Sequence, residues 1–198
     1  MMHTNNFDER ELVDRARKDP AAFGRLFDAH YDAILNYILH RTADVHLAHE
    51  LASNTFFIAL RKLWQFKWRK VPFSAWLYRI ASNEVAKHYR QRKATPTRAI
   101  DLEREDFIDH HSHADREISE AERKVAESRL FLELHRALQK MSARYQEVVV
   151  LKYFENKRIS EIAEITGKAE GTIKSLLHRA HKQLREQIEP VFLSEMES

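Results

Sequence analysis

The sequence of 198 residues contains no cysteine, only three glycines and only four prolines. Without cysteine, disulfide bonds, thiol nucleophiles and cysteine-ligated zinc sites are excluded, which agrees with a reducing cytoplasm. Scarce glycine and proline favour helices, and no alternating apolar run is long enough for a convincing strand. The chain also lacks a signal-peptide core and any apolar stretch near the roughly 20 residues of a membrane span. We therefore predict an all-α, cytoplasmic protein that is not inserted in a membrane.

The formal net charge is only +3, but the charges are unevenly distributed. Residues 83–98 carry five bases and one acid, residues 101–122 carry nine acids and two bases, and residues 168–185 carry five bases and one acid. Two basic segments separated by an acidic one are typical of two nucleic-acid-facing modules on a tether. We predict a helical domain at residues 1–93, a flexible acidic linker at 94–122 and a second helical domain at 123–198.

The first domain is expected to hold four helices. A short helix near residues 11–18 precedes three long ones, each with apolar residues at three-and-four spacing. The predicted start signals of the long helices are Asp19 followed by Pro20, Thr42 or Asp44, and Ser74.

The helix expected at residues 75–92 mixes aromatic and basic side chains. Trp76 and Tyr78 next to Arg79 suit unstacked single-stranded bases, because rings stack on bases and cations follow the phosphates. The same pattern also fits two aromatic residues that cover the core beside solvated bases. The sequence alone leaves both interpretations open.

The acidic linker contains the sequence His110-His111-Ser112-His113. Histidine clusters bind metals, but no neighbouring cysteine or rigid element supports a coordination geometry here. We therefore expect no metal site and regard these histidines as polar surface residues. Elsewhere His46 and His49 are three residues apart beside Glu50, so the H-E-x-x-H spacing of a metal hydrolase is missing.

Residues 159–185 have the pattern of a helix-turn-helix. Gly167 separates a short apolar helix from a second one, whose buried stripe lies opposite a basic face. Asn156 is expected to form a left-handed turn before the motif, residues 143–154 to form one helix, and Pro190 to close the last helix. An ordinary helical hairpin with a solvated basic face would give the same pattern. The density of bases favours contact with DNA phosphates.

Several segments in this order resemble a known family. They are AAFGRLFDAHYDAILNYI, FFIALRKLWQF, FSAWLYRIASNEVAKHYRQRK and SARYQEVVVLKYFENKRISEIAEITGKAEGTIKSLLHRAHKQLRE. Together, over roughly residues 7–188, they resemble the extracytoplasmic-function (ECF) sigma factors, the smallest group of the sigma-70 family of bacterial RNA polymerase initiation factors.

The resemblance implies three sets of binding residues. Those implied to dock on core polymerase are Glu50, Asn54, Phe57 and Arg61. Those implied to melt and read the minus-ten element are Lys70, Trp76, Tyr78, Arg79, Asn83, Lys87 and Arg90. Those implied to bind the minus-thirty-five element are Lys168, Thr172, Lys174, Ser175, His178, Arg179 and Lys182.

Some positions depart from the family pattern. Residues 50–54 read ELASN where the family usually has an acidic, amide-rich segment, and Leu176 stands where arginine is common. Arg158 and Ala169 replace the usual capping serines, which predicts less stable starts of both helices by about 1 kcal/mol each.

The resemblance implies a non-enzymatic sigma factor without a cofactor. Its partners would be core RNA polymerase, promoter DNA and an anti-sigma factor, in a stress or envelope response, and it would be a monomer when free of polymerase. The acidic linker would thread a polymerase channel. The alternatives are a dimeric, polymerase-independent helix-turn-helix regulator and, in another class, a hydrolase or metal enzyme.

Overall fold

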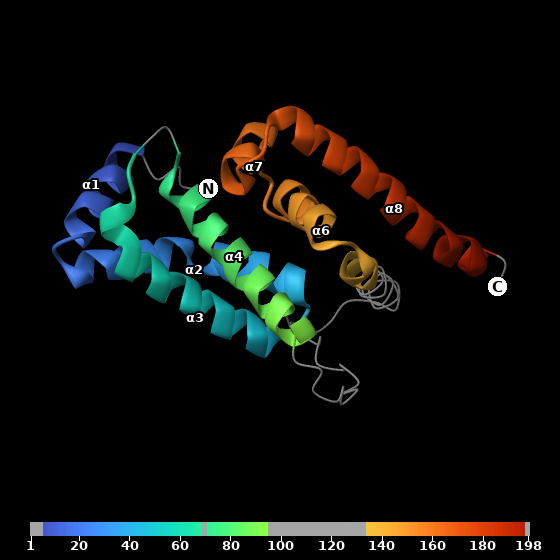
Figure 1. The fold of residues 1–198 in the computed structure, drawn as a ribbon, viewed down its shortest axis with the longest axis horizontal. Helices are drawn as coiled ribbons and strands as arrows, with labels where there is room; N and C mark the ends of the chain where they lie inside the picture. The colour runs from blue at the N-terminus through green and yellow to red at the C-terminus, as the bar shows by residue number, and fades with distance from the viewer. Residues whose placement is uncertain (1–5, 69–70, 95–133, 197–198) are drawn as a thin grey trace, which may run out of the picture.

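The computed structural model describes residues 6–68, 71–94 and 134–196, and no strand occurs in this part of the chain. The all-α prediction is confirmed (Figure 1). Lys70, the His110–His113 cluster and the predicted linker beyond Ala94 lie outside the described residues. Within the described ranges, no helix combines the length and the apolar character needed to cross a membrane.

Four α-helices form the N-terminal module, which we define as residues 6–94. They are α1 (Asn6–Ala16), α2 (Pro20–Thr42), α3 (Val45–Lys62) and α4 (Phe73–Ala94), with a 3-10 turn η1 (Leu63–Gln65) after α3. Apolar side chains of all four fill one core, among them Val13, Leu26, Ile38, Phe56 and Leu77.

Two of the predicted helix starts are confirmed. The Asp19 carboxylate accepts the Ala21 N–H at 2.9 Å before Pro20, and the Asp44 carboxylate accepts the Leu47 N–H at 3.0 Å. These bonds satisfy N–H groups that have no partner within the first turn of a helix.

The other two predicted start signals are wrong. Thr42 is the last residue of α2, and its hydroxyl donates back to the Ile38 carbonyl at 3.0 Å. Helix α4 begins at Phe73, so Ser74 lies inside its first turn. Phe73 is fully buried, so packing of its ring, rather than a serine cap, accompanies the start of this helix.

The C-terminal module, residues 134–196, is also helical. Residues 134–140 are followed by α6 (Ala143–Val149), a π-helical turn η2 (Val150–Phe154), α7 (Ile159–Thr166) and α8 (Glu170–Met196). Asn156 and Gly167 adopt left-handed conformations with φ of 52° and 70°, as predicted, and Gly167 ends the first helix of the helix-turn-helix.

Two features of this module differ from the prediction. The helix expected at residues 143–154 changes to a π turn over its last five residues, which hydrophobic spacing does not reveal. Pro190 does not close the last helix, because α8 continues to Met196. A proline removes one backbone hydrogen bond, but its φ is compatible with a helix, so the chain can pass through it.

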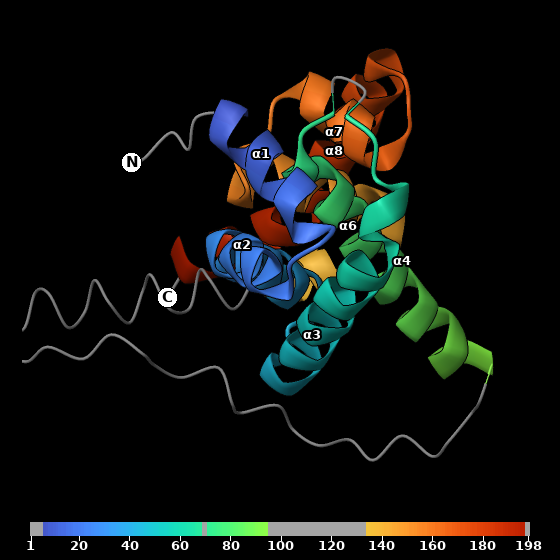
Figure 2. The ribbon, with the colours of Figure 1, turned by 90° about the vertical axis from the view of Figure 1, so that its left-hand side faces the viewer.

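The two modules are packed together. Helix α7 lies beside α4, as the two views in Figures 1 and 2 show, and η2 packs against α2. The buried apolar residues of both modules belong to one continuous cluster. We call this packing the closed arrangement; charge and periodicity in the sequence do not predict it.

Candidate nucleic-acid interface

The solvent side of α8 carries the predicted minus-thirty-five residues. Opposite them, Ile173, Leu176, Leu177 and Ala180 are buried in the core. The exposed members of the predicted set are Thr172, Lys174, Ser175, His178, Arg179 and Lys182. Because a helix presents one face to its core and the other to solvent, this face is accessible to a DNA groove.

Three predicted members of this set have protein partners. The Lys182 Nζ lies 3.9 Å from the Glu186 carboxylate, one turn further along α8. Lys168, in the turn, is half-buried, and its Nζ lies 4.0 Å from the Glu147 carboxylate. The Ser175 hydroxyl donates to the Gly171 carbonyl at 3.1 Å, along its own helix. Leu176, which stands where the family has arginine, is a packing residue in this fold.

The start of α7 is better capped than its sequence suggests. Arg158 offers no side-chain acceptor, but its N–H donates to the Glu161 carboxylate at 2.7 Å. This is the glutamate half of a capping box, and it satisfies one N–H at the helix start.

The predicted minus-ten residues on α4 divide into two groups. Asn83, Lys87 and Arg90 are exposed. Tyr78 is only 2% exposed, and its hydroxyl donates to the Glu155 carboxylate at 2.6 Å. The Arg79 guanidinium donates to the carbonyls of residues 164 and 165 at the end of α7. In the closed arrangement Tyr78 is therefore buried against the C-terminal module, whereas Arg79 contacts that module and stays exposed to solvent.

Burial determines the ionisation of the Tyr78 pair. Loss of solvation, followed by the nearby Glu155 charge, raises the pKa of Tyr78 well above its usual value, so the phenol stays protonated. Burial also raises the pKa of Glu155, against the opposing effects of the Tyr78 hydrogen bond and of Lys157. The Lys157 ammonium lies 4.8 Å from the centroid of the Tyr78 ring, in a cation–π contact.

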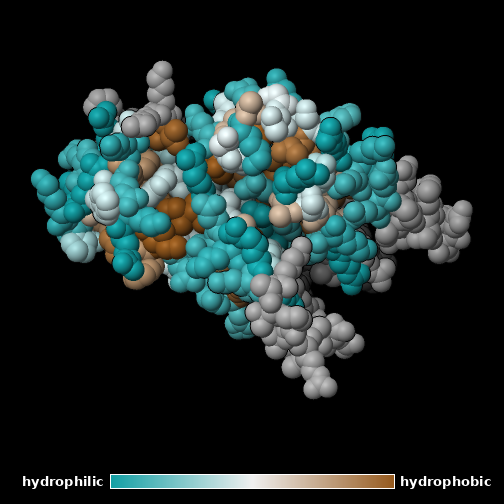
Figure 3. Space-filling model, in the orientation of Figure 1, coloured by the Kyte–Doolittle hydropathy of each residue, from teal (hydrophilic) through white to brown (hydrophobic). Residues whose placement is uncertain are grey.

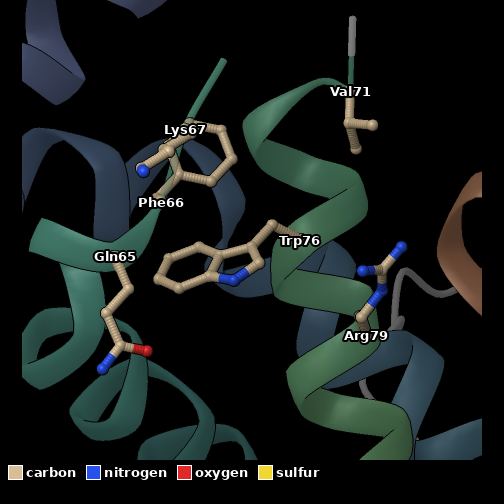
Figure 4. Close-up of a pocket in the computed structure, with 6 residues that line it drawn as sticks. All are labelled: Gln65, Phe66, Lys67, Val71, Trp76 and Arg79. Atoms are coloured by element: carbon tan, nitrogen blue, oxygen red, sulfur yellow. The ribbon is translucent and has the colours of Figure 1, made fainter. Parts of the chain in front are cut away.

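A pocket of about 420 Å³ opens between α4 and the segment after α3 (Figure 4). The Trp76 ring points into it and is held by Phe66 and Phe73, whose ring centroids lie 5.2 and 5.6 Å away. The residues that line the pocket are Gln65, Phe66, Lys67, Val71, Trp76 and Arg79. Trp76 and Arg79 were predicted site residues, whereas Gln65 and Lys67 were not. The sequence signal that could have identified Gln65 and Lys67 is the basic and aromatic composition of residues 65–73, QFKWRKVPF.

The predicted polymerase-binding residues share one exposed face of α3. Glu50, Asn54, Phe57 and Arg61 recur at helical spacing, and the Arg61 guanidinium lies 5.6 Å from the Phe57 ring centroid. Phe57 is 58% exposed. The spacing therefore brings these four side chains to one surface, as the sequence predicted.

Leu60 and Trp64 extend this surface and were missed, because their spacing was read as part of the core stripe. They are 43% and 72% exposed, whereas Phe56 and Leu63 beside them are buried. The apolar residues of α3 spread over a wider arc of the helix than one buried stripe can occupy. This width was the sequence signal that some of them are exposed. The face of the molecule that Figure 3 shows is mainly hydrophilic, with separate hydrophobic patches over both modules. Exposed apolar groups of this kind mark interaction surfaces.

No group of three or more His, Asp or Glu side chains in the described residues has the arrangement of a metal site. His49 is instead hydrogen-bonded to the Tyr31 hydroxyl at 2.9 Å.

Comparison with known proteins gives matches to both modules. A model described as "Sigma-70 region 2" matches residues 26–95, and one described as "Sigma-70, region 4" matches residues 131–184. The C-terminal match contains the helix-turn-helix, and the N-terminal match contains α3 and α4.

Individual relatives carry the same description. The ECF RNA polymerase sigma factor BldN of Streptomyces coelicolor is 34% identical over 175 residues, which are 88% of this chain and 63% of BldN. The ECF RNA polymerase sigma factor SigW of Bacillus subtilis is 28% identical over 180 residues, which are 90% of this chain and 96% of SigW.

Solved structures share the fold. CnrH, in complex with the cytosolic domain of CnrY, superposes with a TM-score of 0.65 at 22% identity, covering 92% of this chain and 97% of CnrH. The sigma factor RpoE from Bartonella quintana, in complex with the anti-sigma factor NepR, gives a TM-score of 0.59 at 22% identity, covering 84% of this chain and 96% of RpoE. The two family matches and the similarity to BldN and SigW agree with each other, and the chain therefore belongs to the sigma-70 family of RNA polymerase sigma factors, in its ECF group.

Proposed function

We propose that this sigma factor binds core RNA polymerase through α3, holds the minus-thirty-five element with α8 and opens the minus-ten element with α4. The observation that carries the proposal is the exposed basic face of α8, opposite a fully packed stripe on the same helix. A recognition helix needs this division, because one side must be fixed while the other enters the major groove. Lys174 and Arg179 would contact phosphates or base edges there.

The surface of α3 has the composition of a protein interface. Phe57, Leu60 and Trp64 supply exposed apolar area, with Glu50 and Arg61 at its edge. Aromatic residues and arginine are enriched at interfaces, where a few of them supply most of the binding energy. This composition supports a macromolecular partner at α3, and core polymerase is the partner we propose.

The pocket beside Trp76 is suited to an unstacked base. It combines an aromatic ring with the cationic side chains of Lys67 and Arg79. A base that leaves the duplex needs a stacking surface and a nearby positive charge for its phosphate. We propose that this pocket takes a base of the melted strand, with Asn83, Lys87 and Arg90 along the strand's path.

The remaining parts of the proposal concern partners and location. An anti-sigma factor would regulate the chain, as NepR is found with the Bartonella quintana relative. The protein would act in the cytoplasm, as a monomer when free of polymerase, and would catalyse no covalent reaction and need no cofactor.

The test is transcription of genomic DNA by bacterial core polymerase, with and without the purified chain, followed by mapping of the start sites. We expect new start sites that share two sequence elements and depend on the chain. The Arg179→Ala variant should give fewer transcripts from the same sites. A chain that binds promoter duplex without polymerase, and gives no start sites with it, would be a polymerase-independent regulator instead.

A further inference from the structure

One wall of the pocket beside Trp76 is held by an arginine that does not line it. Arg17 lies in the turn between α1 and α2, and its Nη2 donates to the Phe66 carbonyl at 2.6 Å. Phe66 is 49 positions away in the chain, directly after η1, and lies across the pocket from α4 (Figure 4). The bond therefore connects the end of α1 to the wall of the proposed base pocket.

The arginine end of this bond is fixed by its neighbours. The backbone forms a tight turn around Arg17, because the N–H groups of Lys18 and Asp19 donate to the Arg15 carbonyl at 2.9 and 3.0 Å. The Asp14 carboxylate lies 3.1 Å from the Arg17 Nη1. An exposed ion pair of this kind adds little stability, but it fixes the plane of the guanidinium. The N–H group that meets Phe66 is therefore already oriented in the free chain.

The Phe66 carbonyl determines where the pocket wall lies. Residues 66–68 belong to neither a helix nor a strand, so no regular hydrogen-bond pattern fixes them. The Phe66 N–H donates to the Leu63 carbonyl at 3.1 Å and ends η1, and the carbonyl of the same residue accepts the arginine. Gln65 and Lys67, on either side of Phe66 in the chain, both line the pocket. A shift of this carbonyl would therefore move both polar side chains of the wall.

The Phe66 ring extends the same contact to the stacking residue. The ring is 4% exposed, and its centroid lies 5.2 Å from that of Trp76 and 5.4 Å from that of Phe73. Protein interiors are close-packed, so a displaced ring displaces the rings that touch it. Release of the Phe66 carbonyl would thus change the position of the Trp76 ring, although Arg17 is not in contact with that ring through any of these bonds.

Helix α1 is attached to the rest of the module at other points as well. The His30 Nε2 lies 2.9 Å from the Glu9 carboxylate, and the His30 ring lies 5.6 Å from that of Phe73, between centroids. Val13 of α1 is fully buried in the core. A substitution of Arg17 should therefore release the pocket wall, while α1 stays packed in its place.

We propose that Arg17 is a positioning residue of the base pocket: by fixing the Phe66 carbonyl, it holds the wall formed by residues 65–67 at the separation from Trp76 that a stacked base requires. This role rests on the proposed function, which assigns the pocket to a base of the melted strand. Arg17 does not touch the base. Its effect on DNA binding therefore requires a base in the pocket, whereas a residue that only stabilises the fold would affect all strands equally.

The test measures how tightly polymerase carrying each variant binds a fluorescein-labelled single strand. The strand has the non-template sequence of the minus-ten element at a mapped start site, and in further versions each base in turn is replaced by an abasic site. Trp76→Ala identifies the position of the bound base, because it should weaken binding of every version except the one that is abasic there. Arg17→Ala and Arg17→Lys are compared with Arg15→Ala, which removes the same charge at an exposed position two residues away.

We expect Arg17→Ala to weaken binding of the intact strand at least about fivefold, because a charge-assisted hydrogen bond that supports base stacking is lost. The version that is abasic at the identified position should bind Arg17→Ala within about twofold of wild type. Arg17→Lys restores a charged donor, so it should bind the intact strand more tightly than Arg17→Ala does. Arg15→Ala should match the wild type on both strands. In the Trp76→Ala background, Arg17→Ala should cost less than about twofold, since both substitutions disturb one contact.

Equal weakening of the intact and the abasic strand by Arg17→Ala would overturn the positioning role, because a loss of folding or of polymerase binding has that result. Fully additive losses in the double variant would overturn it too. If Arg17→Ala does not fold, Asp14→Asn removes only the group that orients the guanidinium. It should give a smaller loss with the same dependence on the base, and an equal loss on both strands would again overturn the role. Failure of the proposed function looks different, because no abasic position would then separate Trp76→Ala from wild type.

Discussion

Replacing Trp76 by alanine tests the assignment of α4 most directly. The side chain is half-buried and points into the pocket, with one part of its ring against Phe66 and Phe73. If a base stacks on this ring, removal of the ring costs about 1 to 3 kcal/mol per base, or roughly 5- to 150-fold in the equilibrium for strand opening. Loss of packing against the two phenylalanines adds a cost to folding, which must be separated from the loss of stacking.

Two variants separate these effects. Trp76→Phe keeps an aromatic ring in the pocket on which a base can stack, so strand opening should be reduced less than in Trp76→Ala. Trp64→Ala removes an indole that is 72% exposed on α3 and does not line the pocket, so it should weaken polymerase binding and leave melting by the assembled complex unchanged.

The assay is permanganate reactivity of unpaired thymines at a mapped start site, measured with polymerase in excess so that all variants are assembled. Core affinity is measured in parallel by competition with labelled wild-type chain. We expect Trp76→Ala to lower thymine reactivity while its core affinity stays within about twofold of wild type, since Trp76 lies outside the exposed face of α3. Normal thymine reactivity with Trp76→Ala would refute the assignment of this pocket to a melted base.

Three further predictions concern the other surfaces. Phe57→Ala should weaken the affinity for core polymerase at least about fivefold, as loss of an interface aromatic does. The unfolding midpoint should hardly change, because the ring is mostly exposed. An affinity equal to that of wild type would remove α3 from the interface. If Arg179 reads a base, Arg179→Ala should weaken promoter binding by about 1 to 3 kcal/mol. If it contacts a phosphate, the same variant should reduce the salt dependence of binding. An unchanged affinity together with an unchanged salt titration would contradict both roles. Burial, and then the neighbouring His135, lower the pKa of His40 from 6.5 to about 4. A chain whose two modules have separated therefore takes up the proton first, and the closed arrangement should lose stability as the pH falls from 6.5 towards 4. Cysteines introduced at the exposed positions Ala29 on α2 and Ser160 on α7 can carry a donor and an acceptor dye. Energy transfer between these dyes, measured in a Glu155→Gln background to remove the opposing titration of that carboxylate, should fall over this range, and a flat profile would contradict the prediction.

Local chemistry was predictable because it depends on neighbours in the sequence. Asp19 and Asp44 cap their helices through bonds that span two or three residues, and Gly167 and Asn156 adopt the left-handed turns expected of them. The basic face of α8 follows from the spacing of its buried stripe. Each of these features is determined within about one helical turn.

Features that depend on distant residues were not predictable. Burial of Phe73 coincides with a start of α4 before the serine that looked like its cap. For Tyr78 the sequence left a stacking role and a core-covering role open, and it could not decide between them because the partner, Glu155, is 77 positions away in the chain. Helical periodicity identifies a residue on a non-core face, but it does not reveal whether another module covers that face.

The π turn at Val150–Phe154 has a consequence for how related chains diverge. A π turn holds one residue more than an α turn, so side chains beyond it are rotated by about 100° relative to those before it. Val148 and Leu151 thus serve the core of their own module, while Phe154 reaches His40 of α2, with 4.2 Å between ring centroids. In evolutionary terms, the loss of a single codon in this segment would remove this rotation and turn Phe154 away from His40, so alignments of descendants should be inspected for such a change of length here.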